Sequence, residues 1–302
     1  MQEVVAAVDV GGTRIKAALV DRSYDVVAGL TVPTPADIGA DIGSTVASAV
    51  GGLLATAERD GAPVRLVGCG VVVPGLVDER RGVGLWSANL GWRDLPVRDA
   101  VAARLQVGTV VGHDVRAGLL AETRLGAARG ARHALFLPVG TGIAGALLLE
   151  GVLISGDGWA GELGHMVIDP AGPPCACGAV GCLETLASAA AVERAYAAKT
   201  GERLPAERVA ALAVAGDPAA GWVWGRAVAA LGAAIAATVT LTGVDLVLVG
   251  GGLAESGETL LAPLRADLDT RLTFQRRPRL VKAALGDRAG CLGAACLAWD
   301  AL

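Results

Sequence analysis

One histidine and three cysteines that lie close together carry the strongest chemical signal in this chain. The cysteines follow a C-x-C-x4-C pattern downstream of the histidine, in a stretch rich in glycine and proline. Zinc prefers four nitrogen or sulfur ligands in a tetrahedron, and four protein ligands leave no position for water, so such a site is structural. The expected zinc ligands are His165, Cys175, Cys177 and Cys182.

Two alternative roles for these residues stay open. Cysteine is often a small core residue, so the cluster also fits buried thiols beside a hydrogen-bonded histidine. A disulfide is less favoured, because the start of the chain resembles no secretory signal and a reducing cytoplasm, the expected location, favours a metal. Glu162 and Glu184 bracket the cluster, and a loop fixed by a metal would position these carboxylates for a ligand.

The first apolar run ends in an acid followed by two glycines and a hydroxyl. Residues 4–10 read as a buried strand that contains Asp9 and leads into Gly11, Gly12 and Thr13. Glycines let backbone N–H groups approach a phosphate, and the threonine adds a donor. Asp9 is placed to hold Mg²⁺, directly or through water. The alternative is an ordinary hairpin turn, because this short pattern is not specific alone.

Two more glycine-rich turns follow later strands. After the strand at 134–137, the run from Gly140-Thr141-Gly142 to Gly145 matches G-x-G-x-x-G. A dinucleotide fold places that motif after its first strand and at the start of a helix. Here it lies mid-chain before a second short strand, so we expect a phosphate-binding turn, and a nicotinamide oxidoreductase is the alternative. The third turn, Gly250-Gly251-Gly252, precedes a helix.

An acid at the carboxyl end of another strand is the candidate general base. The strand at 107–112 is followed by His113 and Asp114 and then by a helix. Sheets of α/β proteins bind ligands at this end of their strands, so Asp114 is placed to accept a proton. Asp is also a common helix N-cap, and the local sequence does not separate the two roles. Asn89, in a polar loop between two tryptophans, is either a hydrogen-bond donor to a ligand or a turn cap.

The composition indicates an α/β protein with a core of small aliphatic side chains. The 302 residues are 53% hydrophobic and only 3% aromatic, which suits parallel sheets covered by helices. The net charge of −4 and the lack of a basic run argue against nucleic acid as a partner. Apolar runs such as residues 144–149 are too short to span a membrane.

Both halves of the chain open with a strand, a glycine turn and a second strand. This duplicated pattern is similar to the actin-like ATPase (ribonuclease H-like) fold of sugar kinases, in which two α/β domains enclose a sugar and nucleotide cleft. With G-E-x-G-H at 161–165 and C-x-C-G-x-x-G-C-x-E at 175–184, the sequence resembles the ROK family of bacterial sugar kinases and repressors, most closely its glucokinases. The repressors carry a helix-turn-helix before the first strand, so we expect the kinase branch.

The resemblance implies a role for each motif. Residues 9–13 and 140–142 match phosphate-binding turns, and residues 250–252 match the turn beside the adenosine. The cysteines and His165 match structural zinc ligands, and Asp114 matches the catalytic base. The implied cofactors are ATP, Mg²⁺ and a structural Zn²⁺. The positions that match residues in contact with the sugar are Asn89, His113, Asp114, Glu162, His165 and Glu184.

The resemblance also implies how the chain is divided and assembled. A small domain is expected over residues 1–115, joined by the last helix at about 287–302, and a large domain over 116–286 with the zinc loop. We expect a cytoplasmic homodimer or homotetramer that binds a sugar and ATP, without a nucleic-acid or membrane partner.

One departure from the family pattern concerns the choice of sugar. The family usually has asparagine before the catalytic Asp, and this chain has His113. Asparagine offers a donor and an acceptor, whereas a neutral imidazole offers one of each at different angles. We expect phosphorylation of a hexose at the 6-hydroxyl, first of all glucose. The alternative is an amino or N-acetylated hexose, such as N-acetylmannosamine, N-acetylglucosamine or 3-amino-3-deoxyglucose, and less favoured is a sugar-sensing regulator without catalysis.

Overall fold

The computed structural model describes residues 1–87 and 90–302, which form two compact units. The first unit comprises residues 1–124, 155–160 and 287–302, and the second comprises residues 125–154 and 161–286. The end of the chain thus belongs with its beginning. Asn89 lies outside the described residues, and the functional domain boundary at residue 115 stays a prediction.

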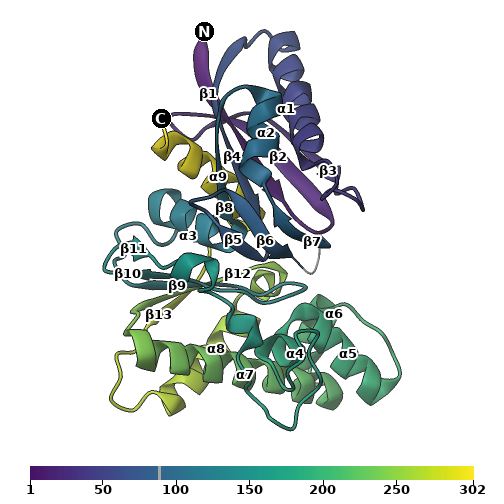
Figure 1. Cartoon of the computed structure of the whole chain (residues 1–302). Coiled ribbons are helices and arrows are strands. Elements are labelled where there is room, and N and C mark those ends of the chain that lie inside the picture. Colours follow the sequence, from purple (N-terminus) through teal and green to yellow (C-terminus); the bar gives the residue numbers. More distant parts are fainter. Residues whose placement is uncertain (88–89) are drawn as a thin grey trace. The chain divides into compact units, whose positions relative to one another are not determined.

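The first unit is built on a five-stranded sheet with the order β3-β2-β1-β4-β8 (Figure 1). Strand β2 is antiparallel to β1 and β3, while β1, β4 and β8 are parallel. The carboxyl ends of these three parallel strands meet at one edge of the sheet, where α/β proteins bind ligands. The strands are β1 (Gln2–Val10), β2 (Arg14–Asp21), β3 (Val26–Pro33), β4 (Val64–Val73) and β8 (Gly108–His113).

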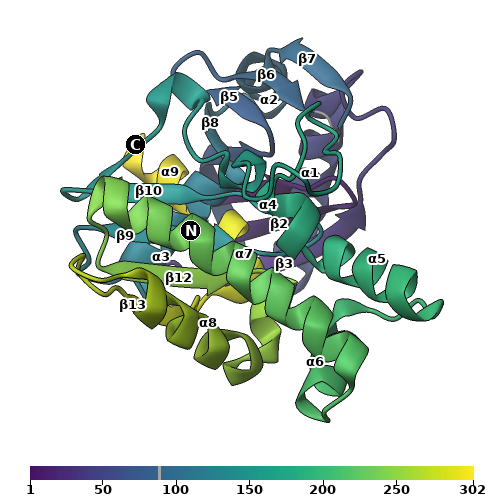
Figure 2. The same ribbon diagram turned by 90° about the horizontal axis from the view of Figure 1, so that it is seen from below.

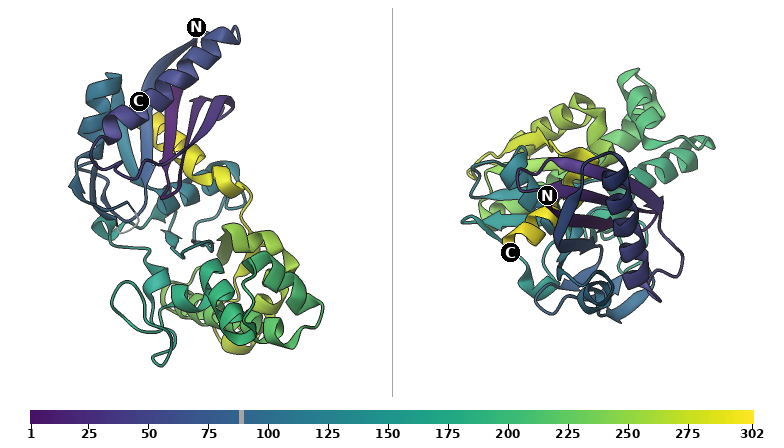
Figure 3. Two further views of the ribbon diagram at one scale, coloured as in Figure 1. Left: turned by 90° about the vertical axis from the view of Figure 1, so that its right-hand side faces the viewer. Right: turned by 90° about the horizontal axis from the view of Figure 1, so that it is seen from above.

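Helices cover both faces of this sheet, and the alternation along β1 explains why. Val4, Ala6 and Val8 pack with α1 and α2, whereas Val5 and Ala7 pack with α3 and α9. Figure 3 shows the yellow helix α9 on one side of the strands and the dark blue α1 on the other. Successive side chains of a strand point to opposite faces, so the next odd-numbered residue, Asp9, faces α9. The helices are α1 (Ile42–Arg59), α2 (Val97–Leu105), α3 (Asp114–Leu125) and α9 (Ala289–Asp300).

A second, three-stranded sheet in this unit contains the two tryptophans that flank the expected polar loop. In the structure Trp86 belongs to β6 and Trp92 to β7, and Ser87 pairs with Trp92 across these antiparallel strands. The strands are short, and Gly84 and charged residues interrupt their apolar pattern, so the alternation was too weak to detect. They are β5 (Leu76–Asp78), β6 (Val83–Ser87) and β7 (Trp92–Leu95).

The sheet of the second unit repeats the topology of the first, with the order β11-β10-β9-β12-β13. The central strand β9 pairs antiparallel with β10 and parallel with β12, as β1 does with β2 and β4. The duplicated strand–turn–strand pattern predicted from the sequence is confirmed. These strands are β9 (Ala134–Pro138), β10 (Ala146–Leu149), β11 (Val152–Leu153), β12 (Leu246–Gly250) and β13 (Arg279–Lys282).

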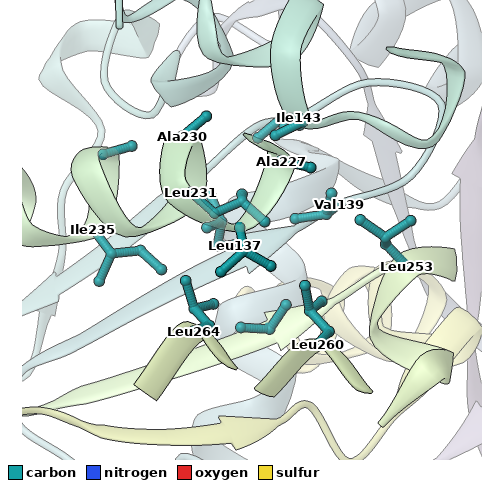
Figure 4. Close-up of a cluster of buried hydrophobic side chains, with 14 of the residues drawn as sticks. Leu137, Val139, Ile143, Ala227, Ala230, Leu231, Ile235, Leu253, Leu260 and Leu264 are labelled. Atoms are coloured by element: carbon teal, nitrogen blue, oxygen red, sulfur yellow. The ribbon is translucent and has the colours of Figure 1, made fainter. Parts of the chain in front are cut away.

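The long helix α7 (Pro218–Thr242) forms the centre of the core in the second unit. Figure 2 shows it crossing the sheet beside α8 (Glu258–Arg271), and in Figure 4 its residues Leu231 and Ile235 lie near Leu137 of β9. By length and composition α7 could span a membrane, but its apolar side belongs to the buried cluster of this unit. The remaining helices are α4 (Leu183–Ala187), α5 (Ala189–Thr200) and α6 (Ala206–Val214), with short 3₁₀ turns η1 (Gly156–Gly158), η2 (Leu163–His165), η3 (Gly252–Ser256) and η4 (Gly286–Arg288).

Capping acids set the starts of two helices. Helix α1 begins at Ile42, and the preceding Asp41 accepts a 2.9 Å hydrogen bond from the Ser44 N–H. Helix α7 begins after Asp217, whose carboxylate accepts from the Ala220 N–H at 2.7 Å. Such caps satisfy N–H groups that have no partner within the helix.

Candidate active site

Asp9 lies at the ligand-binding edge of the first unit, against the start of α9. A Cβ on Gly290 would lie 2.5 Å from an Asp9 carboxylate oxygen, so only glycine allows this approach. Lys16 is paired with Asp9 across β1 and β2, and its Nζ donates to the Asp287 carbonyl at 2.7 Å. Burial raises the pKa of Asp9 to about 6, opposed by Lys16 and reinforced by Asp287. A bound cation would favour the carboxylate form.

The turn after Asp9 has the form of a tight hairpin. The Gly11 N–H donates to the Arg14 carbonyl at 3.0 Å, and a Cβ on Gly11 would lie 2.9 Å from that same oxygen. Gly12 and Thr13 are exposed at its tip. The turn is therefore a hairpin, which was the alternative interpretation of this motif. Its exposed tip is also accessible to a phosphate.

His113 and Asp114 form the junction between β8 and α3, and the histidine is the helix cap. The His113 Nδ1 lies 3.2 Å from the Val115 backbone nitrogen and 3.4 Å from that of Arg116, and accepts from both N–H groups. Asp114 lies within the first turn, where its Oδ1 accepts from the Val115 N–H at 2.7 Å. An N-cap role for Asp114 is thus not required.

The ring of His113 is neutral and has a fixed proton position. Burial, assisted by the Arg116 cation, lowers the pKa of His113 to about 3. Because Nδ1 accepts hydrogen bonds from the helix, the ring proton is on Nε2. The 3.4 Å separation between His113 Nδ1 and Asp114 Oδ1 is accordingly not an ion pair.

Two charged residues behind this junction could not be recognised in the sequence. Glu79 Oε1 accepts from the His113 N–H at 3.1 Å and from Arg116 Nε at 2.9 Å. The Arg116 side chain is only 4% exposed. These residues are distant in sequence and share no motif, and the one available signal was a charge on the buried side of α3.

In the second unit, Glu184 lies directly against the second glycine turn. Its Oε2 accepts from the Ile143 N–H at 2.9 Å and lies 2.6 Å from where a Cβ on Gly142 would stand. The start of α5 contacts the same turn, because the Ala189 N–H donates to the Gly140 carbonyl at 2.8 Å. An expected sugar ligand and an expected phosphate turn are therefore neighbours.

The third glycine turn packs against the second. Val139, which precedes Gly140, donates its N–H to the Gly250 carbonyl at 2.9 Å and accepts from the Leu253 N–H at 3.0 Å. Gly251 has a φ of 76°, and a Cβ there would lie 2.5 Å from the Val139 carbonyl oxygen, so this close approach requires glycine. A pocket of about 390 Å³ lies among α6, α7 and α8 of the same unit, with Val214, Trp224 and Thr259 in its lining.

The histidine and cysteines of the predicted zinc site come together in the second unit. Their ligand atoms all lie within 4.8 Å of one another. His165 Nδ1 is 3.6 Å from Cys175 Sγ, and the sulfurs of Cys177 and Cys182 are 3.7 Å apart. A tetrahedron with bonds of about 2.3 Å has edges of about 3.8 Å, so the separations fit one zinc ion. The other ring nitrogen, Nε2, lies 3.9 Å from the Glu162 carboxylate.

A family model and named sequence relatives each match nearly the whole chain. The ROK family model matches residues 5–301. A glucokinase from Halalkalibacterium halodurans is 32% identical over 309 residues, covering 95% of this chain and 92% of that protein. A kanosamine kinase from Amycolatopsis mediterranei is 30% identical over 294 residues, covering 96% and 94%.

Solved structures show the same fold over the full chain. The ROK hexokinase from Thermus thermophilus is 36% identical with a TM-score of 0.85, covering 99% of this chain and 98% of that one. A ROK family glucokinase from Streptomyces griseus, solved with glucose and AMPPNP, is 30% identical with a TM-score of 0.82, covering 98% and 99%. These likenesses confirm the actin-like ATPase fold predicted from the sequence, and the chain belongs to the ROK family.

Proposed function

We propose that this chain is an ATP-dependent kinase that phosphorylates the 6-hydroxyl of glucose. One observation carries the proposal: the acid suited to hold a metal and the acid suited to accept a proton lie on the same sheet edge. In the register of the first sheet, Asp9 pairs with Val72 and Val72 with Gly112, the residue before His113 and Asp114. Full-length similarity to glucokinases supports the same reaction.

The proposed chemistry is mostly positioning and charge neutralisation. Backbone N–H groups of the turns at 11–13 and 140–142 hold the phosphates, and the turn at 250–252 lies beside the adenosine. Asp9 would hold Mg²⁺, which would offset the negative charge of the phosphates. Asp114 accepts the proton of the attacking hydroxyl, while Glu162 and Glu184 orient the sugar.

Zinc is proposed to act one step away from the reaction. His165, Cys175, Cys177 and Cys182 would hold it, and their atoms have the separations of a tetrahedral site. His165 would offer Nδ1 to the metal, and its Nε2 lies 3.9 Å from the Glu162 carboxylate, too far for a direct hydrogen bond but on the side from which a carboxylate commonly orients a ligating histidine. A metal there would fix the loop that carries Glu162 and precedes Glu184.

The second candidate function is phosphorylation of an amino or N-acetylated hexose, and it depends on what His113 can bind. Since its Nδ1 already accepts from α3, the ring offers a sugar only the Nε2–H donor. A hydroxyl or an acetyl carbonyl can accept that bond, whereas a protonated amine has donors only. Glucose and N-acetylated hexoses therefore fit His113 better than 3-amino-3-deoxyglucose, although the similarity to a kanosamine kinase keeps that sugar among the candidates.

The test is ADP release with Mg-ATP across a panel of glucose, mannose, N-acetylglucosamine, N-acetylmannosamine and 3-amino-3-deoxyglucose. Glucose is expected to give the strongest signal. A stronger signal with an N-acetylated hexose would identify the second function. Binding of a sugar without turnover of any would indicate a regulator and contradict the kinase proposal.

Light scattering of the same protein measures its mass in solution and so tests the proposed homodimer or homotetramer.

A further inference from the structure

Arg116 is the most deeply buried cation in the neighbourhood of the proposed base. Its side chain is 4% exposed, and it lies in the first turn of α3, two residues after Asp114. Its Nε donates to Glu79 Oε1 at 2.9 Å, and its Nη1 donates to the Ala160 carbonyl at 3.1 Å. One guanidinium therefore joins three stretches of the first unit that are distant in sequence.

Glu79, at one end of this network, contacts the backbone at the junction between β8 and α3, where the proposed base Asp114 lies. The same oxygen that accepts from Arg116 also accepts from the His113 N–H at 3.1 Å. The Glu79 side chain is 35% exposed, so the arginine fixes a carboxylate that would otherwise sample several positions. Arg116 thereby orients the backbone immediately before Asp114.

The Ala160 end reaches residues 155–160, here called the strap. The strap belongs to the first unit, and Gly161 and Glu162 follow it directly. Gly156, Asp157 and Gly158 all have positive φ values, and a Cβ on Gly158 would lie 2.3 Å from the Val77 carbonyl oxygen. Asp157 also pairs with Arg80 at 3.0 Å. The strap is thus fitted closely to the first unit just before the chain reaches a proposed sugar ligand.

This arrangement is not the one that stability alone would favour. Nη2 of Arg116 is buried without a hydrogen-bond partner among the described residues, and an unpaired buried donor lowers stability. Apolar residues of similar size often replace buried ion pairs without loss of stability. A cation at this position therefore calls for a role besides packing.

We propose that Arg116 is a positioning residue that couples the Asp114 end of α3 to the strap within the first unit, and so holds the proposed base where it accepts the proton of the sugar hydroxyl. The inference rests on the proposed kinase function. Misalignment of reacting groups by a small distance slows a reaction strongly, so loss of Arg116 should affect the chemical step and the sugar rather than the nucleotide.

The test compares Arg116→Met and Arg116→Lys with Arg124→Met, a matched control on the same helix. Arg124 pairs with Asp300 at the far end of α3, away from the junction. The readouts are steady-state kinetics with glucose and Mg-ATP, and hydrogen exchange of residues 155–160. For Arg116→Met we expect kcat/KM for glucose to fall about tenfold or more, KM for ATP to stay the same, and the strap to exchange faster. Arg116→Lys should retain part of the activity that Arg116→Met loses, and Arg124→Met should match wild type.

Wild-type kinetics in Arg116→Met would overturn the proposal. So would an equal loss of sugar use, nucleotide use and thermal stability, because that pattern indicates a general structural role. If Arg116→Met does not fold, the kinetics and the strap exchange of Arg116→Lys and Glu79→Gln test the proposal in its place. If wild type phosphorylates no sugar, the kinase function has failed, and unchanged strap exchange in the variants would separately refute the coupling.

Discussion

Asp114 is the residue on which the proposed chemistry depends most directly. His113 caps α3, so Asp114→Asn should leave the fold intact. Loss of a positioned base typically reduces kcat by about 10²–10⁴-fold, and we expect a fall in that range with an unchanged melting temperature. Asp99→Asn, at an exposed acid in the first turn of α2, is the matched control. Full turnover by Asp114→Asn would show that another group takes the proton.

His113 makes the protein sensitive to acid. In the unfolded chain the imidazole takes up a proton as pH falls below its ordinary pKa of 6.5, but the folded ring does so only near pH 3. The unfolded state therefore binds more protons in this window, and stability present above pH 6.5 is lost as pH falls toward 3. The loss is on the order of a few kcal/mol.

This loss can be measured with His113→Asn, which keeps a side chain able to cap α3. We expect its melting temperature to fall less than that of wild type between pH 7 and pH 4.5. His133→Asn, at a partly exposed histidine of the second unit, serves as the control and should retain the wild-type acid sensitivity. If the melting temperatures of wild type and His113→Asn fall equally over this pH range, the His113 ring is not neutral and buried as described.

At the scale of elements, the start of α9 supports Asp9. Gly290→Ala would place a methyl group 2.5 Å from the Asp9 carboxylate, so the acid must move. We expect weaker use of Mg-ATP, seen as a raised KM for ATP, with little change in KM for the sugar. Gly51→Ala in α1, where a Cβ meets nothing within 4 Å, controls for the gain in helix propensity. Normal nucleotide use by Gly290→Ala would place the metal elsewhere.

The zinc loop is the second element with a measurable role. A chelator should reduce affinity for the sugar, because Glu162 is then no longer ordered through His165, while nucleotide affinity changes little. Metal analysis should give about one zinc per chain. Cys177→Ser should lose the metal, and Cys69→Ser, at a buried thiol of the first unit, should keep it. Normal sugar affinity in folded, metal-free protein would contradict this role.

The sequence predicted the elements with strong local signals and missed those that depend on distant contacts. Strands β1, β8 and β9 were evident as apolar runs, and the cysteine spacing identified the metal cluster. Strands β6 and β7 were missed because they are short and interrupted. Arg116 and Glu79 could not be paired, because only the folded sheet brings residues 37 positions apart together. The capping role of His113 was likewise invisible, since it depends on the ring's orientation.

At the scale of the whole molecule, two units of the same sheet topology carry different candidate site residues. The first carries Asp9 and Asp114 on its sheet edge, and the second carries two glycine turns and the zinc loop. The repetition of strand order explains why a glycine turn follows the first strand of each sheet. Under the proposed function, each unit contributes one phosphate-binding turn, the first unit adds the base Asp114, and the second adds the sugar ligands Glu162 and Glu184.

Helix α9 also has a consequence for biosynthesis. It covers the face of β1 that carries Asp9, and the Cys291 thiol contacts the Ala7 carbonyl at 3.3 Å across 284 positions of sequence. While the ribosome is still translating the second unit, the first sheet therefore shows bare apolar side chains on one face. We expect a nascent chain at that stage to be a client for chaperones that bind such surfaces, while Asp9 still lacks the helix that encloses it. The first unit is consequently completed only at the end of translation.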